Sequence, residues 1–356
     1  MYGQTWGELG TTPPSRAWQM LRSLRHDPPG WARKGERKLV FGSALEQAEQ
    51  LFAAARVVTP ATSPLLLFYG LSQAGRAVAA SATGKENANR WRLAGHGVTN
   101  EQPTGLNAAT IAALKVRNQE SGAFTQVADI LNAASLPDPV SLGNLWCLLP
   151  ESGRFPLPGM GDARPIDISL TSYETSGDST VTATVPVPVG LINRADMVPD
   201  FSGLGANWDE KRAGIRDFLA QFPSLQGWQF TSEAGQPIEV RGYGAEITQV
   251  NIQWDKPAEL EAKDALLRHA TGYRGAHLAF PAIGTDPRAP HPFLLWWAIL
   301  YVLSKLARYE PSTWASLTSI SSSSAAAPIE HVLRESMAIL PELIHRTIFE
   351  VAAPPV

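Results

Sequence analysis

The chain has 356 residues, which is more than a single hydrophobic core usually contains. Of these residues 44% are hydrophobic and 18% are charged, as is ordinary for a folded protein. Its formal net charge of −3 excludes the global positive field that drives sequence-independent binding to nucleic acid, and leaves room only for a local basic patch. The single cysteine, Cys147, excludes an intrachain disulfide and a structural zinc site made from cysteines.

The N-terminal third predicts an arm followed by a pair of helices. Residues 1–35 mix tryptophan, glycine, proline and arginine, which indicates an arm with one short helix near 15–24. Apolar residues at helical spacing predict an amphipathic helix over 43–56. A serine followed by a proline predicts the start of a second helix, which extends over 63–84. Because the connection between these helices is short, we expect them to pack as a hairpin.

The middle of the chain changes from helical to extended patterns. Two short helices are predicted over 108–114 and 124–134. Beyond them, segments rich in β-branched residues flank a Thr-Ser-Gly-Asp sequence at 175–178, which indicates a β-hairpin. Further strand patterns follow, and a single helix is predicted over 209–221. The sequence therefore predicts a β-rich insertion over 150–285.

The most apolar stretch of the chain predicts a buried helix over 292–309. Proline occupies its first turn, and Pro311 disfavours helical backbone at the residue before it, so both ends are marked. The apolar run is well short of the roughly 20 residues that cross a membrane. Another apolar helix is predicted over 329–351.

Helices from both ends of the chain are expected to close into one bundle, which together with the insertion makes an α+β fold. The expected organisation is an N-terminal arm (1–40), the first part of the helical core with a mixed segment (41–149), the β-rich insertion (150–285) and the second part of the helical core (286–356).

Two of the predicted helices carry a polar stripe on an otherwise apolar surface. Residues three and four apart share one face of a helix. The stripes consist of Tyr69, Ser72, Gln73 and Arg76 on the first helix, and of Tyr301, Ser304, Lys305 and Arg308 on the second. If both helices belong to one bundle, their arginines can converge on an anion, because guanidinium is a planar donor fork suited to phosphate or carboxylate. The alternative is a pair of solvated or salt-bridged faces, with Glu46, Glu49 or Glu310 as internal partners.

A second candidate site is the Arg-Trp-Arg-Leu-Ala-Gly-His-Gly segment at 90–97. Glycines on both sides of His96 leave its imidazole accessible to a ligand. The spacing from Arg90 to His96 resembles the arginine-to-histidine spacing of HEPN-type ribonucleases, in which histidine acts as general acid or base and arginine holds the phosphate. Such nucleases place this motif on a helix, whereas the two glycines favour a turn.

Several common motifs are absent from the sequence. The Gly84-Lys85-Glu86 segment lacks the GxxxxGK[ST] pattern of a phosphate loop, and there is no GxSxG nucleophile elbow. No two histidines have the helical spacing of metal ligands, so no metal is expected, and the sequence specifies no cofactor. The N-terminus lacks a basic segment followed by an apolar one, which favours a cytoplasmic location.

Four segments carry a resemblance to a known family. They are SPLLLFYGLSQAGRAVAA, RLAGHG, GLNAATIAALKVRNQESGAF and LYVLSKLARYEPSTW, and together they extend over most of the chain. As a set they resemble the YaaC-like bacterial proteins. This resemblance implies a cytoplasmic bacterial protein with a helical core and an undefined activity, and it supplies no catalytic residues.

The leading hypothesis is a regulatory or binding protein that recognises an anionic ligand, such as a nucleotide or nucleic acid, or a protein partner. Its site is expected in a pocket between the helical bundle and the β-rich insertion. The expected binding residues are Tyr69, Gln73, Arg76, Tyr301, Ser304 and Arg308. The alternative is an RNA-cleaving or nucleotide-processing enzyme, for example in bacterial defence against phage. Its catalytic residues would be His96 with Arg90 or Arg92.

Overall fold

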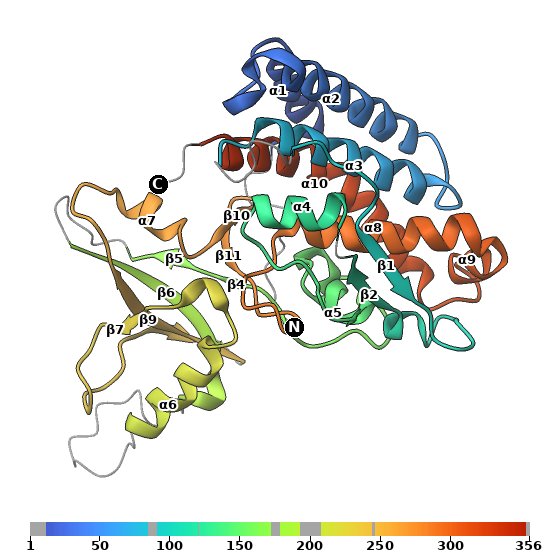
Figure 1. Cartoon of the computed structure of the whole chain (residues 1–356). Coiled ribbons are helices and arrows are strands. Elements are labelled where there is room, and N and C mark those ends of the chain that lie inside the picture. The colour runs from blue at the N-terminus through green and yellow to red at the C-terminus, as the bar shows by residue number, and fades with distance from the viewer. Residues whose placement is uncertain are drawn as a thin grey trace. The chain divides into compact units, whose positions relative to one another are not determined.

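The computed structural model describes residues 12–84, 91–119, 121–171, 179–192, 208–243 and 246–353 (Figure 1). The chain divides into two compact units, one formed by Met1–Arg164 with Ile283–Val356 and the other by Pro165–Ala282. The first unit is mainly helical, and the second contains most of the strands. The predicted α+β fold is therefore confirmed.

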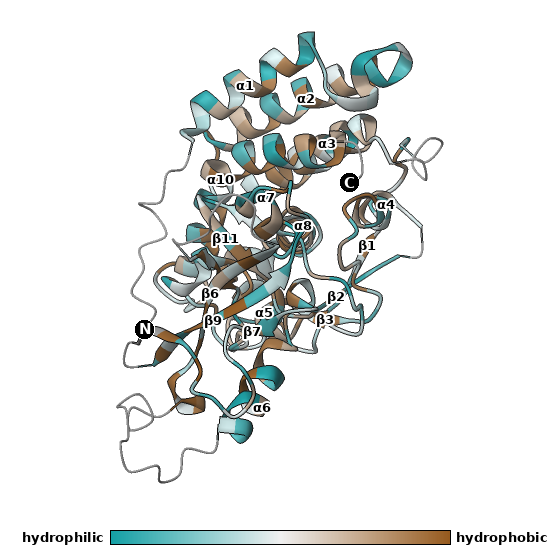
Figure 2. Ribbon diagram, turned by 90° about the vertical axis from the view of Figure 1, so that its left-hand side faces the viewer, coloured by the Kyte–Doolittle hydropathy of each residue, from teal (hydrophilic) through white to brown (hydrophobic). Residues whose placement is uncertain are grey.

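The helical unit is built from five long helices that come from both ends of the chain. They are α1 (Pro14–His26), α2 (Gly35–Ala55), α3 (Ser63–Ser81), α8 (Pro292–Tyr309) and α10 (Ala326–Ala352). Helix α3 packs against α2, α8 and α10, and α1 also contacts α10 (Figure 1). The expected closure of N-terminal and C-terminal helices into one bundle is confirmed. Both hydrophilic and hydrophobic residues occur along α1 and α2 (Figure 2), as in amphipathic helices.

Shorter elements complete this unit. They are the helices α4 (Ala123–Ile130), α5 (Leu142–Cys147) and α9 (Pro311–Leu317), the strands β1 (Val98–Glu101), β2 (Lys115–Asn118) and β3 (Val140–Ser141), and 3-10 turns at Gly30–Arg33, Ile111–Ala113 and Pro150–Gly153. The three strands form an antiparallel sheet in the order β1-β2-β3. The helix predicted over 108–114 is only the 3-10 turn Ile111–Ala113.

The predicted bounds of α8 are confirmed at both ends. His291 precedes the helix, and its Nδ1 accepts a hydrogen bond from the Phe293 backbone amide at 3.2 Å. Helix α2 instead begins eight residues before the predicted start at 43. Its first turns carry no apolar stripe, because Leu39 is 72% exposed and Phe41 is the first buried side chain. Apolar periodicity therefore marks only the part of α2 that packs against the core.

The second unit contains two antiparallel sheets. The larger has the order β5-β6-β9-β7, with β8 also paired to β9, and the smaller has the order β10-β11-β4. Their strands are β4 (Ile166–Asp167), β5 (Ser169–Leu170), β6 (Thr180–Pro188), β7 (Gln229–Phe230), β8 (Val240–Tyr243), β9 (Ile247–Asp255), β10 (Thr271–Tyr273) and β11 (Ala276–Ala279). The helices are α6 (Trp208–Leu219) and α7 (Ala262–Leu266), and 3-10 turns occur at Val189–Leu191 and Pro223–Leu225.

Strands β6 and β9 form the centre of the larger sheet and pair along nine residues, with Val185 opposite Val250. Their buried side chains share one core with Ile215 and Leu219 of α6. Strands β5 and β6 pair as the two arms of the predicted hairpin, and the predicted turn at 175–178 lies outside the described residues.

The insertion was predicted over 150–285, whereas the β-rich unit extends from Pro165 to Ala282. The segment before Pro165 makes contacts within the helical unit. Arg164 donates to the carbonyls of Cys147 and Gly161 at 3.2 and 3.1 Å. The described part of the chain contains no helix that combines the length and the apolar character needed to cross a bilayer.

Candidate functional site

The two polar stripes meet where α3 packs against α8. Arg308 of α8 donates a hydrogen bond from Nη1 to the hydroxyl of Tyr69 on α3, and its guanidinium lies 5.9 Å from the centre of that ring. Beside this contact, the rings of Phe68, the neighbour of Tyr69, and of Tyr301, two turns before Arg308, meet edge to face at 5.5 Å. The helices therefore bring together side chains that are more than 200 positions apart in the sequence.

His96 lies at the same junction. Its ring centre is 5.4 Å from that of Phe68 and 6.0 Å from that of Tyr69. Two turns after Tyr69 on α3, Arg76 donates to the carbonyl of Leu93 at 2.7 Å, which ties the loop before His96 to this helix. The loop thus places the imidazole beside both polar stripes.

A close approach of two backbones holds the His96 loop. Gly97 has a φ of +74°, and a Cβ on this residue would stand 2.8 Å from the Phe124 amide nitrogen. That amide donates to the His96 carbonyl at 3.2 Å, and the Gln119 amide donates to the Gly97 carbonyl at 2.9 Å. Only glycine readily adopts this left-handed backbone, and there is no space here for a Cβ. Gly97 therefore fixes His96 between α3 and α4, on a turn rather than on a helix.

The electrostatic surroundings of His96 are basic. Burial lowers its pKa, and the positive charges of Arg308 and Arg76 lower it further. The imidazole is consequently neutral at physiological pH. Its Nδ1 and the Nε of Arg308 are buried polar atoms without a hydrogen-bond partner. Lys305, one turn before Arg308, places its ammonium 6.0 Å from the centre of the Tyr301 ring.

We call Arg76, His96, Lys305 and Arg308 the basic cluster. All four are half-buried. Across the described ranges, no carboxylate lies within ion-pair distance of any of them. Two of the three acidic partners suggested by the sequence are engaged elsewhere, since Glu46 pairs with Arg25 and Glu49 pairs with Arg22. The third, Glu310, follows α8 directly and forms no ion pair with the four cluster residues. The cluster thus concentrates positive charge that no described side chain neutralises.

Not every residue expected in the site joins this cluster. Arg92 is exposed, forms an ion pair with Glu36 of α2 and stacks on Trp91 at 4.8 Å, so its charge is paired outside the cluster. Ser304 is buried and donates to the Tyr301 carbonyl of its own helix at 2.8 Å. Gln73 is half-buried on α3, and Arg90 lies outside the described residues.

The stripe pattern missed one aromatic neighbour of the cluster. Tyr309, the last residue of α8, is 61% exposed, and the Arg308 guanidinium lies 4.4 Å from its ring centre. Because adjacent residues of a helix point about 100° apart, Tyr309 is not on the face defined by the stripe. The only sequence feature that could have indicated the contact of Tyr309 with the cluster is its position next to Arg308 at the end of the helix.

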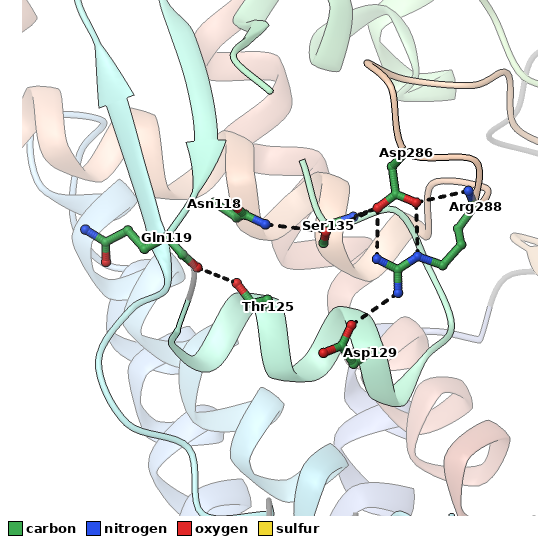
Figure 3. Close-up of polar contacts among 7 residues, drawn as sticks. All are labelled: Asn118, Gln119, Thr125, Asp129, Ser135, Asp286 and Arg288. Carbon is green, nitrogen blue, oxygen red and sulfur yellow. Dashed lines mark hydrogen bonds and ion pairs between the residues drawn. The ribbon is translucent and has the colours of Figure 1, made fainter. Parts of the chain in front are cut away.

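A separate polar group around the buried Asp286 has a structural role (Figure 3). Asp286 Oδ2 accepts hydrogen bonds from the Ser135 amide at 2.9 Å and from Arg288 Nη2 at 2.8 Å. Arg288 also contacts Asp129 of α4 at 3.2 Å. Burial alone would raise the pKa of Asp286, but the hydrogen bonds from Arg288 and from the backbone amides hold it well below its usual range. The group ties the loop that leads into α8 to the region around α4.

A family model described as YaaC-like Protein matches residues 15–348. The chain belongs to the YaaC-like protein family. The match includes α3, the His96 loop and α8, so it extends over the whole basic cluster. Among curated proteins and among solved structures, no match was found.

In this YaaC-like protein, the side chains of the site suit an anion better than a cation. Two arginines, a lysine and a tyrosine hydroxyl can all donate hydrogen bonds. Within the described residues there is no group of three or more histidine, cysteine, aspartate or glutamate side chains that could hold a metal ion. The site therefore offers positive charge and hydrogen-bond donors where α3 packs against α8.

Proposed function

We propose that this YaaC-like protein binds a phosphate-bearing anion at the basic cluster. The observation that carries the proposal is the gathering of Arg76, His96, Lys305 and Arg308 without a carboxylate partner among the described residues. Partial burial of uncompensated charge is unfavourable, and a bound anion would offset that cost. Helical surfaces that serve only structure commonly pair their cations with acidic side chains, as Arg22 and Arg25 do here.

Both arginines keep donors for such a ligand. Arg308 uses one nitrogen on the Tyr69 hydroxyl, and Arg76 uses one on the Leu93 carbonyl. Each guanidinium has five N–H donors, so most of its donors stay available. Because the two arginines belong to different helices, they can donate to separate oxygens of one phosphate. These charge-assisted hydrogen bonds would have a defined geometry.

A purely structural explanation accounts for only part of the cluster. Lys305 and Arg308 lie near the C-terminal end of α8, where positive charge stabilises the helix dipole. Arg76 lies well before the end of α3, and His96 lies on a loop, so neither is placed to serve the α8 dipole. The convergence of all four side chains is better explained by a shared anion.

The first test replaces the two cluster residues of α8. The double variant Arg308→Gln with Lys305→Gln is expected to weaken pyrophosphate binding by about 10- to 100-fold, because charge-assisted hydrogen bonds and charge are lost together. Isothermal titration calorimetry would measure the affinity. The matched control is Arg92→Gln, which removes a basic side chain outside the cluster and should change affinity less than about 2-fold. Equal losses in both proteins, or no loss in the double variant, would contradict the proposal.

Anion binding should also depend on pH through His96. Its pKa is lowered by burial and by Arg308 and Arg76 in the empty site, and a bound dianion offsets those two charges. The pKa therefore rises on binding, a proton is taken up, and affinity increases as the pH falls. Between pH 7.5 and 5.5 sulfate stays dianionic, so its own charge does not change. Over that range the affinity of the protein for sulfate should rise by roughly 10-fold. In His96→Gln the affinity for sulfate should no longer depend on pH, and an unchanged pH dependence in that variant would refute the assignment to His96.

A second candidate function is RNA cleavage or nucleotide processing. It is favoured by the neutral His96 imidazole beside two arginines, which is the state required of a general base. The arginines next to His96 are Arg76 and Arg308, whereas the sequence motif suggested Arg90 or Arg92. An enzyme of this kind would lose turnover in His96→Ala and keep its affinity for the phosphate. A protein partner is less well supported, because Trp31 is the only described tryptophan with substantial exposure, at 38%.

A further inference from the structure

One aromatic side chain of α8 departs from the pattern of that helix. The helix buries Phe293, Trp296, Trp297 and Tyr301, whereas Tyr309 at its last position is 61% exposed. Single exposed aromatics are ordinary on protein surfaces, so exposure alone has no meaning. The informative feature is that Tyr309 stands beside the basic cluster.

The ring of Tyr309 is joined to the cluster by contact. The Arg308 guanidinium lies 4.4 Å from the ring centre, within the range of a cation–π interaction. Tyr309 is also near Tyr301, whose pKa is raised chiefly by burial, lowered by Arg308 and raised by Tyr309. Arg308 therefore contacts both Tyr69 and Tyr309.

A nucleotide has a flat base at one end and a phosphate at the other. The ring of Tyr309 can stack on the base, and the adjacent Arg308 can bind the phosphate. Aromatic side chains stack on nucleobases of any type, because every base has a π-face. The high exposure of Tyr309 leaves ring surface available to such a base, and the Arg308 guanidinium lies 4.4 Å from the ring centre. A base on this ring would therefore lie close to the arginine that holds the phosphate.

We propose that the ligand of this site is a mononucleotide, with its phosphate on the basic cluster and its base stacked on Tyr309. This inference rests on the anion site proposed above and adds the class of ligand. It assigns to Tyr309 the recognition of the base, and to Arg76, Lys305 and Arg308 the recognition of the phosphate.

The charges around the site favour a single nucleotide over a nucleic acid strand. Proteins that bind single strands combine aromatic rings with a basic groove that follows the backbone. Here two basic side chains of the loop and its following hairpin already have acidic partners, Arg92 with Glu36 and Arg117 with Glu101. The formal net charge of −3 adds no attraction over a longer distance.

The test compares ligands that differ only in the base. Calorimetric titrations of the full chain would use AMP, UMP and ribose 5-phosphate, which share the sugar phosphate. In the unaltered protein, AMP and UMP should bind on the order of 10-fold more tightly than ribose 5-phosphate. In Tyr309→Ala this advantage should fall to less than about 2-fold, whereas Tyr309→Phe should keep it, because the ring remains. Ribose 5-phosphate should bind equally to all three proteins.

The control is Phe349→Ala, which removes another exposed aromatic ring, on α10, and should leave the advantage of AMP unchanged. Because Tyr309 is exposed, its variants should keep the melting temperature, which thermal unfolding would verify. Equal affinity for AMP and ribose 5-phosphate, or an advantage that survives in Tyr309→Ala, would overturn the inference and leave the anion site standing. Failure of all three ligands to bind would remove the anion site as well. An RNA pentamer that binds more than 100-fold more tightly than AMP would replace the mononucleotide by a strand.

Discussion

Replacing Asp286 with alanine is expected to lower the free energy of unfolding by about 3 kcal/mol. The carboxylate is buried and accepts hydrogen bonds from the Ser135 amide, the Arg288 amide and the Arg288 guanidinium. Its loss leaves those donors without their acceptor, and it releases the loop before α8 from the region of α4 (Figure 3). Urea denaturation at pH 7 would measure the change.

The free energy of unfolding of the same variant should also depend on pH differently from that of the unaltered protein. The folded protein holds the pKa of Asp286 below its usual value, so the stabilisation is complete above about pH 4 and is lost as the pH falls further. The acid side of the stability curve should therefore be flatter in Asp286→Ala. The control is Asp129→Ala, which removes the other contact of Arg288. Asp129 is 53% exposed, so its loss should cost less than about 1 kcal/mol. Equal costs for the two variants would show that Asp286 has no special role.

The second large effect is expected at the crossing of α3 and α8. Gly75 lies directly against Trp297, and a Cβ on this residue would stand 2.5 Å from Cη2 of the buried indole. Trp297 has no space to withdraw, because it also packs edge to face against Phe124 and Phe293. The variant Gly75→Ala should therefore force the two helices apart and lose about 2–4 kcal/mol of stability.

The same substitution on α2 provides the control. Gly42 has no atom within 4 Å of the position of an added Cβ, and it lies inside the helix. Gly42→Ala should raise stability by about 0.5–1 kcal/mol, because alanine has the better helix propensity. Since α3 and α8 together position Tyr69 and Arg308, Gly75→Ala should also weaken pyrophosphate binding. A stable Gly75→Ala protein with unchanged affinity would show that the helix crossing tolerates a wider spacing.

Local signals identified much of the helical unit correctly. The prolines at 292 and 311 marked both ends of α8, and the serine and proline at 63 and 64 marked the start of α3. The early turns of α2 were missed, because they face solvent and have no apolar periodicity. Helix α5 was missed as well, since it has only six residues and all but one of them are buried, which leaves no polar face to define a period.

By itself, the sequence determined the mixed α+β fold, the family, and the two polar stripes on α3 and α8. These features depend on residues a few positions apart, whose spacing is set by the geometry of a helix or strand. Only the tertiary structure decided which stripe residues meet. The contact of Arg308 with Tyr69, the place of His96 between them and the diversion of Arg92 to Glu36 each join distant segments. Such pairings follow from how packed helices and a glycine-dependent turn fill space together, and no local pattern contains that information.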